Sequence, residues 1–133
     1  PKVASALNEM GSLARQLGQL EEAEQHYRRA GAIWRSVHGE KHYLHGIALS
    51  NLASVALDRD DLGQAEALMR KALVKFVEAA GPQHSNAGIA HLKLGRVLLR
   101  AKRWRAAGEE LRRGMAILEP QMEASSPWLA AGR

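Results

Sequence analysis

Three closely spaced histidines are the first candidates for chemistry in this sequence. His38, His42 and His45 stand three or four residues apart, and imidazole rings one helical turn apart can share a metal ion. The chain has no cysteine to add to a ligand set, and His42 recurs as His84 at the end of a second Gly-x-x-His segment. A histidine repeated in this way is typical of a turn in which ring nitrogens satisfy exposed helix ends. We therefore expect structural histidines, with no metal and no other cofactor.

Catalytic motifs have no support in the sequence. A nucleophilic site needs a nucleophile, a base and an orienting group that converge, and serine, histidine and aspartate are not grouped in this way. The chain also lacks a Gly-x-x-x-x-Gly-Lys phosphate loop and a Gly-x-Gly-x-x-Gly fingerprint. We expect no enzymatic activity.

Basic residues gather in the last third of the chain. The net charge is +5, and all of this excess falls within residues 86–133, where five of the ten residues from Arg96 to Arg105 are basic. Phosphate contacts by these cations would allow nucleic-acid binding. Trp104 is the one aromatic residue in the run, and its correspondence with Leu20 and Leu62 predicts a core position instead of a base-stacking one. Nucleic-acid binding is thus the less favoured alternative.

Composition is typical of a soluble globular domain. The chain has 133 residues, of which 46% are hydrophobic and 25% charged, and no apolar run approaches the roughly 18 residues of a membrane span. We expect one folding unit, a cytoplasmic location and no membrane association. Because the chain starts at Pro1 and stops at Arg133, we also expect it to be a piece of a longer protein.

A sequence period of 42 organises the elements that carry these groups. Two sets of alanines show it: Ala6, Ala48 and Ala90, and then Ala23, Ala65 and Ala107. Within each copy, apolar residues lie three or four apart, which predicts two helices per copy. Breaks between the two helices are expected at Gly18-Gln19, Asp60-Asp61 and, less clearly marked, Ala101-Lys102-Arg103. Pro120 is predicted to stop the last helix early.

These residues resemble the tetratricopeptide signature, in which a large apolar residue, Leu-Gly/Ala, Ala, an aromatic residue and Ala follow in fixed order. The first copy matches it with Leu7, Met10, Gly11, Ala14, Ala23, Tyr27 and Ala30. The second copy matches with Leu49, Leu52, Ala53, Ala56, Ala65, Met69 and Ala72, and the third with His91, Leu94, Gly95, Leu98, Ala107, Leu111 and Gly114. The resemblance implies an all-α, right-handed superhelix of three helical hairpins plus a C-terminal stub.

Small residues at Gly11, Ala53 and Gly95 should let the two helices of each hairpin approach closely. Gly114 differs, because glycine weakens a helix by about 1 kcal/mol relative to alanine. His91 also replaces the first apolar residue of the signature in this copy, so the third repeat is predicted to be the loosest.

The period of 42 residues is longer than the period of about 34 residues usual for tetratricopeptide repeats. This period and the turns between copies resemble the kinesin-light-chain subtype. Both turns follow its Gly-x-x-His pattern: Gly39-Glu40-Lys41-His42 and Gly81-Pro82-Gln83-His84. The expected repeats are residues 3–43, 44–85 and 86–127, and residues 128–133 resemble the start of a truncated fourth repeat. The resemblance also implies a larger bacterial protein, in which such arrays are often joined to signalling or kinase domains.

By the same resemblance, the first helix of each repeat lines a concave groove that binds a partner. The groove positions that we expect to contact it are Asn8, Ser12, Arg15, Ser50, Asn51, Ser54, Lys93, Arg96 and Arg100. The same faces also carry Ile47, Asp58 and Ile89. Neutral groups in the first two repeats suit an extended backbone, and the three cations of the third suit a carboxylate.

We therefore expect a non-catalytic scaffold that binds a protein or short peptide, with an acidic motif or a C-terminal carboxylate as ligand. The alternative is self-association through exposed terminal repeats, or an intramolecular regulatory role in a larger signalling protein.

Overall fold

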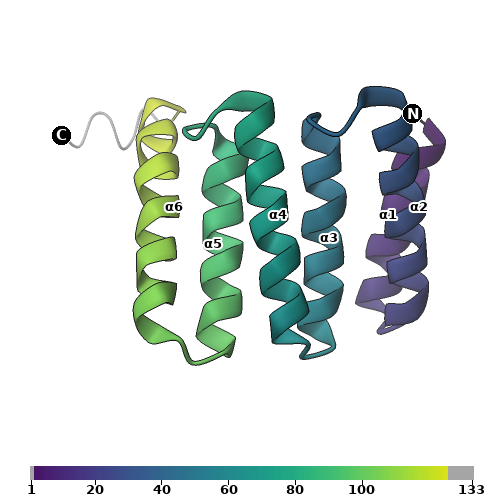
Figure 1. Ribbon diagram of the computed structural model, residues 1–133, viewed down its shortest axis with the longest axis horizontal. Coiled ribbons are helices and arrows are strands. Elements are labelled where there is room, and N and C mark those ends of the chain that lie inside the picture. The colour runs from purple at the N-terminus through teal and green to yellow at the C-terminus, as the bar shows by residue number, and fades with distance from the viewer. Residues whose placement is uncertain (1, 126–133) are drawn as a thin grey trace.

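A computed structural model describes residues 2–125, and within this range the chain forms six helices and no strands. The helices are α1 (Lys2–Gln16), α2 (Leu20–His38), α3 (Tyr43–Asp58), α4 (Leu62–Ala80), α5 (Ser85–Arg100) and α6 (Trp104–Ser125). They stand side by side in chain order, and each packs against the next (Figure 1). This is the predicted all-α superhelix of three helical hairpins. None of these helices combines the length and apolar character needed to cross a membrane.

The turns inside the three hairpins share one backbone conformation. Gly18, Asp60 and Lys102 occupy equivalent positions of the three repeats and have φ values of 77°, 61° and 63°. Left-handed backbone is uncommon outside glycine, so the fold imposes it on Asp60 and Lys102. Asp61 then caps α4, because its Oδ1 accepts a hydrogen bond from the Gln64 amide at 3.3 Å. The third turn, which the sequence marks least clearly, thus follows the other two.

The turns between hairpins use glycine and histidine as predicted. Gly39 and Gly81 have positive φ values of 89° and 92°. His42 and His84 follow as N-caps, and their Nδ1 atoms accept hydrogen bonds from the amides of Leu44 at 3.3 Å and Asn86 at 3.1 Å. These bonds satisfy helix-end donors that would otherwise depend on water.

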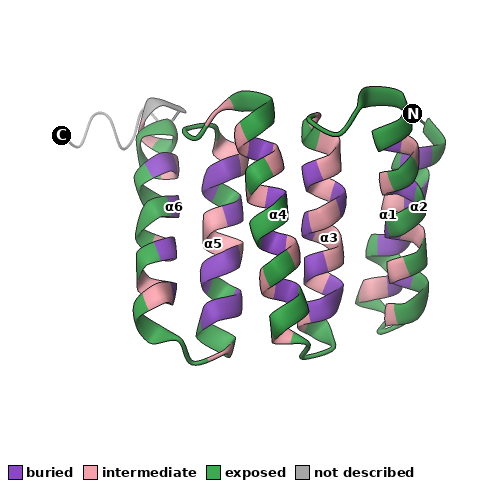
Figure 2. Cartoon of the chain, viewed as in Figure 1, coloured by how far each residue is buried: buried purple, intermediate pink, exposed green. Residues whose placement is uncertain are grey.

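Buried residues recur along each helix between exposed ones (Figure 2). Small residues among them set the distance between paired helices. A Cβ atom added at Gly11 would lie 2.7 Å from the Tyr27 ring, and one added at Gly95 would lie 2.7 Å from Leu111. Gly114 belongs to the same class, since an added Cβ would meet the Gly88 carbonyl oxygen at 2.8 Å. The missing side chain at Gly114 therefore lets α6 pack closely on α5, and the expectation that the third repeat is the loosest stays a prediction.

Pro120 does not stop the last helix, contrary to the prediction. α6 continues to Ser125 with Pro120 inside it. The proline leaves the Ala116 carbonyl without its helical donor, but both residues are exposed, so water can supply that bond. Gln121 Nε2 also donates to the Ile117 carbonyl at 3.1 Å and to the Gln83 carbonyl at 2.9 Å, which ties the last turns of α6 to the α4–α5 turn.

Trp104 is not a core residue, contrary to the prediction, because 64% of it is exposed. Its counterpart Leu20 is half-buried and packs against a cluster that contains Val55 of the following repeat. Within residues 2–125 no helix follows α6 to cover Trp104 in the same way. The proposed start of a fourth repeat at residues 128–133 lies outside the described residues.

Candidate functional site

Polar side chains of neighbouring first helices meet on one surface. Asn51 Nδ2 donates to Asn8 Oδ1 at 2.6 Å, and Lys93 Nζ donates to Ser50 Oγ at 3.2 Å. We call the surface carrying the nine predicted groove residues the first-helix surface. The structure therefore joins predicted site residues across repeats, but it uses part of their hydrogen-bonding capacity to connect α1 with α3 and α3 with α5.

Arg15 is neutralised on this surface by a residue of the next repeat. Its Nε donates to Asp58 Oδ2 at 2.6 Å, and its Nη2 donates to Asp58 Oδ1 at 3.3 Å. The hydrogen bond to Asp58 raises the pKa of Arg15 above its usual range. A forked pair of this kind fixes both side chains, so Arg15 is less available to an incoming carboxylate than its position suggests.

The three serines among the predicted groove residues form hydrogen bonds within the protein. Ser12 Oγ lies 2.8 Å from Tyr27 Oη, and Ser54 Oγ donates to the Ser50 carbonyl at 3.2 Å. Ser50 itself is buried. These bonds hold the Ser12 and Ser54 hydroxyl groups in place, and contact between the three serines and a partner stays a prediction.

Lys93 and Arg96 form the positive part of the first-helix surface. Lys93 is half-buried, and burial lowers its pKa, as do the nearby charges of Arg15 and Arg96. Within residues 2–125 neither Lys93 nor Arg96 has a carboxylate partner. Arg100 differs, because it pairs with Asp60 at 3.1 Å. Two cations therefore remain without neutralisation at the centre of the third repeat's first helix.

A cavity of about 240 Å³ opens beside Lys93, between α3 and α5. Ile47, Ile89 and Phe76 give it apolar walls, while Ser50, Asn51 and Asn86 contribute polar groups. It can take one apolar side chain of a ligand next to a cation. Phe76 and Asn86 were not among the predicted site residues, because Phe76 occupies a core position of a second helix and Asn86 lies at the very start of α5. Only the packing of the two repeats exposes both to the same space.

The three spaced histidines are engaged with their surroundings. The His38 and His42 rings stack with centroids 4.3 Å apart, and His45 Nδ1 lies 3.0 Å from the Glu40 carbonyl oxygen. Over residues 2–125, no three histidine, aspartate or glutamate side chains gather in a way that could hold a metal ion.

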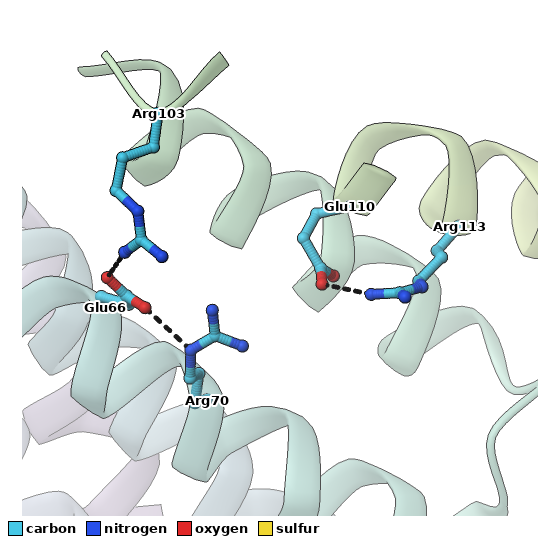
Figure 3. A network of polar contacts seen from close by, with 5 residues as sticks. All are labelled: Glu66, Arg70, Arg103, Glu110 and Arg113. Carbon is cyan, nitrogen blue, oxygen red and sulfur yellow. Dashed lines mark hydrogen bonds and ion pairs between the residues drawn. The ribbon is translucent and has the colours of Figure 1, made fainter. Parts of the chain in front are cut away.

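A buried polar network explains the histidine at a core position of the third repeat. Glu110 of α6 is buried, and its carboxylate lies 2.7 Å from His91 Nδ1 and 2.6 Å from an Arg113 nitrogen. Figure 3 shows the Arg113 contact beside the second network, in which Glu66 of α4 holds both Arg70 and Arg103. His91 thus packs between helices because a carboxylate satisfies its ring.

Ion pairs also connect α2 and α4, the second helices of the first two repeats, to the following repeat. Arg59 donates to Glu24, and Arg103 donates to Glu66 at 2.7 Å. The hydrogen bond from Arg59 lowers the pKa of Glu24. Arg100 and Arg103, two of the five cations between Arg96 and Arg105, are therefore occupied within the protein, which leaves a smaller free basic surface than the sequence suggested.

A sequence model of the tetratricopeptide repeat matches residues 2–74 and 45–119 of the chain. The structure resembles BtubC (BKLC) from P. vanneervenii, with a TM-score of 0.82 and 22% identity over 91% of this chain and 48% of that one. It also resembles a protein of Podosopora anserina that is described as a kinesin light chain with nearly identical TPR-like repeats. The TM-score is 0.78, and the identity is 18% over 96% of this chain and 60% of that one. The likeness is one of fold, and the chain spans about half to three-fifths of these proteins. No curated protein matches the chain.

Proposed function

Because the chain belongs to the tetratricopeptide repeat family, whose fold is generally a scaffold for protein interactions, we propose that it binds an extended acidic peptide of a partner protein on the first-helix surface. The observation that carries the proposal is that Lys93, which lines an apolar cavity, and the nearby Arg96 have no carboxylate partner within residues 2–125.

The chemistry of this region suits a carboxylate next to an apolar side chain. Lys93 is already desolvated in part and repelled by Arg96 and Arg15, so a bound anion would relieve an unfavourable charge arrangement. A charge-assisted hydrogen bond to a carboxylate is worth about 1.5–3 kcal/mol. The ligand group is an acidic side chain or a C-terminal carboxylate, and its neighbouring residue fills the cavity.

The length of the surface limits the ligand to a short motif. Packed helices lie roughly 8–10 Å apart, so three first helices span about 20 Å, or about six residues of extended peptide. Asn8 of the first repeat and Asn51, which lines the cavity, retain polar capacity along this path, where they suit a peptide backbone.

An array of acidic peptides and free C-terminal tails, probed with the purified chain, tests the proposal. Arg96→Glu should weaken the selected peptide by about ten- to a hundredfold, because it replaces attraction by repulsion. Arg112→Glu in α6 is the matched control, since Arg112 is also exposed but lies on another helix. Equal losses in both variants, or an array without any acidic preference, would contradict the proposal.

Self-association is a second candidate, favoured by an apolar stripe on α1. The stripe consists of side chains that are 49% to 64% exposed: Val3, Met10, Leu13 and Leu17. In the second repeat, the counterparts of Met10 and Leu13 are Leu52 and Val55, and these pack against α2 instead. A concentration-dependent mass in sedimentation equilibrium, lost in Leu13→Glu, would support it. A monomer at every concentration would exclude it for this chain. The cytoplasmic location and the link to a signalling protein remain predictions.

A further inference from the structure

A second hollow lies on the opposite side of α3, between the second helices of the first two repeats. Ala48, Leu49 and Leu52 form its floor, and at 100° per residue these positions point away from Ser50, Asn51 and Ser54 of the first-helix surface. A cavity of about 210 Å³ along α2 shares Arg35, His45 and Leu49 with one of about 430 Å³ against α4. We call the two together the second-helix trough.

The wider part of the trough is positively charged. Arg35 of α2 and Lys71 and Lys75 of α4 line it together with Leu49 and Val74, and among the described residues 2–125 no carboxylate belongs to its lining. Arg35 and Lys71 are exposed and have no ion-pair partner within residues 2–125, while Lys75 has only a loose contact with Glu78 at 3.9 Å. Cations gathered around an apolar hollow concentrate the electrostatic field there and attract an anion.

The neighbouring part of the same channel has a balanced charge. A cavity of about 220 Å³ adjoins the trough through Arg28 and Leu52, and there Glu24 and Asp61 accompany Arg28 and Arg59. The channel is therefore positive at the end of α2 that carries Arg35 and neutral at the other. This polarity favours a ligand with its acidic groups at one end over a uniformly charged one.

We propose that the second-helix trough is a separate docking site for an acidic peptide segment that carries an aliphatic side chain. The carboxylates of the peptide lie between Arg35, Lys71 and Lys75, and its aliphatic side chain contacts Leu49 and Val74. Nucleic acid fits less well, because Tyr27, the one Phe, Tyr or Trp among the described lining residues, is buried and the adjoining cavity carries carboxylates.

Two acidic peptides that differ only in a central leucine or glycine provide the probe. They are titrated into the isotope-labelled full chain, and amide shifts locate the site while fluorescence polarisation gives the affinity. The leucine peptide should shift the amides of Arg35, Leu49 and Val74 and bind about tenfold more tightly than the glycine peptide.

Charge-reversal variants separate this site from the first-helix surface. Arg35→Glu together with Lys71→Glu should weaken the leucine peptide by at least about tenfold, and Arg29→Glu together with Arg112→Glu should change it by less than about twofold. All four residues are exposed, so folding should be retained. Val74→Asp, also exposed, should weaken binding without removing a cation.

The proposal is overturned if the shifts cluster at Lys93 and Arg96 and binding depends on Arg96 instead. It also fails if both double variants lose affinity equally, if no shift occurs at millimolar peptide, or if a single-stranded oligonucleotide displaces the peptide at lower concentration. Because Arg96→Glu tests the first-helix surface alone, the two sites can fail independently.

Discussion

Replacing Gly114 by alanine should destabilise the protein, although alanine is the better helix former. In an isolated helix the change would stabilise by about 1 kcal/mol. In the folded chain the new Cβ would lie 2.8 Å from the Gly88 carbonyl oxygen and 2.7 Å from Leu92 Cδ2, so that α6 would have to move away from α5. Overpacking of this kind costs about 1–3 kcal/mol, which leaves a net loss of up to about 2 kcal/mol.

Gly108→Ala is the matched control in the same helix. Its new Cβ would meet only the far end of the Arg112 side chain at 3.3 Å, which can move aside. This variant should keep most of the gain in helix propensity, so the difference between the two variants should be about 1–3 kcal/mol, the cost of packing alone.

Urea denaturation followed by circular dichroism measures both variants against the unchanged chain, with equal m-values as the check that only the free energy of unfolding has changed. If Gly114→Ala proves as stable as Gly108→Ala, the close approach of α5 and α6 is not what requires glycine, and the packing argument is refuted.

Three further predictions concern polar groups and backbone. Glu110→Ala should lower the free energy of unfolding by about 2–3 kcal/mol, because it removes charge-assisted bonds from a buried site, whereas Glu109→Ala on the exposed face should change it by under about 0.5 kcal/mol in the same urea assay. The pKa of Lys93, measured by NMR, should lie below 10.5 and rise in Arg96→Glu, because that change removes a repelling charge. Since a lowered pKa means that the folded chain binds fewer protons than the unfolded one, stability should increase as pH rises through the window between the folded-state pKa and 10.5, and Lys93→Met should abolish that increase. Lys102→Gly should stabilise the chain by about 1 kcal/mol, because its φ of 63° favours glycine, and an unchanged thermal midpoint would contradict this.

Most of the fold could be predicted because residues with the same structural role recur at equivalent positions of the three repeats. Small residues such as Gly11 and Gly95, and histidines such as His42 and His84, reappear at the same position of different repeats, so each repeat supports the interpretation of the others. The errors came where one copy departs from the pattern. Pro120 has no proline at the equivalent positions of the other repeats, so only the general rule that proline ends helices could be applied. Trp104 corresponds to leucines, and the match to Leu20 could not show whether a further helix covers it.

The sequence predicted the candidate site only as a set of positions on the first helices, and their contact with a partner stays a prediction. The charges of these positions could not be predicted. The sequence placed Arg15, Lys93, Arg96 and Arg100 on the first helices as equivalent cations. The structure separates them, because Arg15 and Arg100 pair with aspartates while Lys93 and Arg96 have no such partner in the part of the chain that the structure describes. Side chains of this length can reach partners on several turns of a neighbouring helix, so spacing along the chain does not select the partner.

The sequence by itself determined the number of helices, their pairing into hairpins, and the residues at which hairpins turn. These features depend on interactions within one repeat or between adjacent repeats, and periodicity records them directly. Only the tertiary structure decided which cations stay unneutralised, where Phe76 and Asn86 join one cavity, and that a second, basic hollow lies behind α3. Those features arise from the distance and angle between packed helices, which are set by the summed contacts of many side chains and have no signature in any single segment.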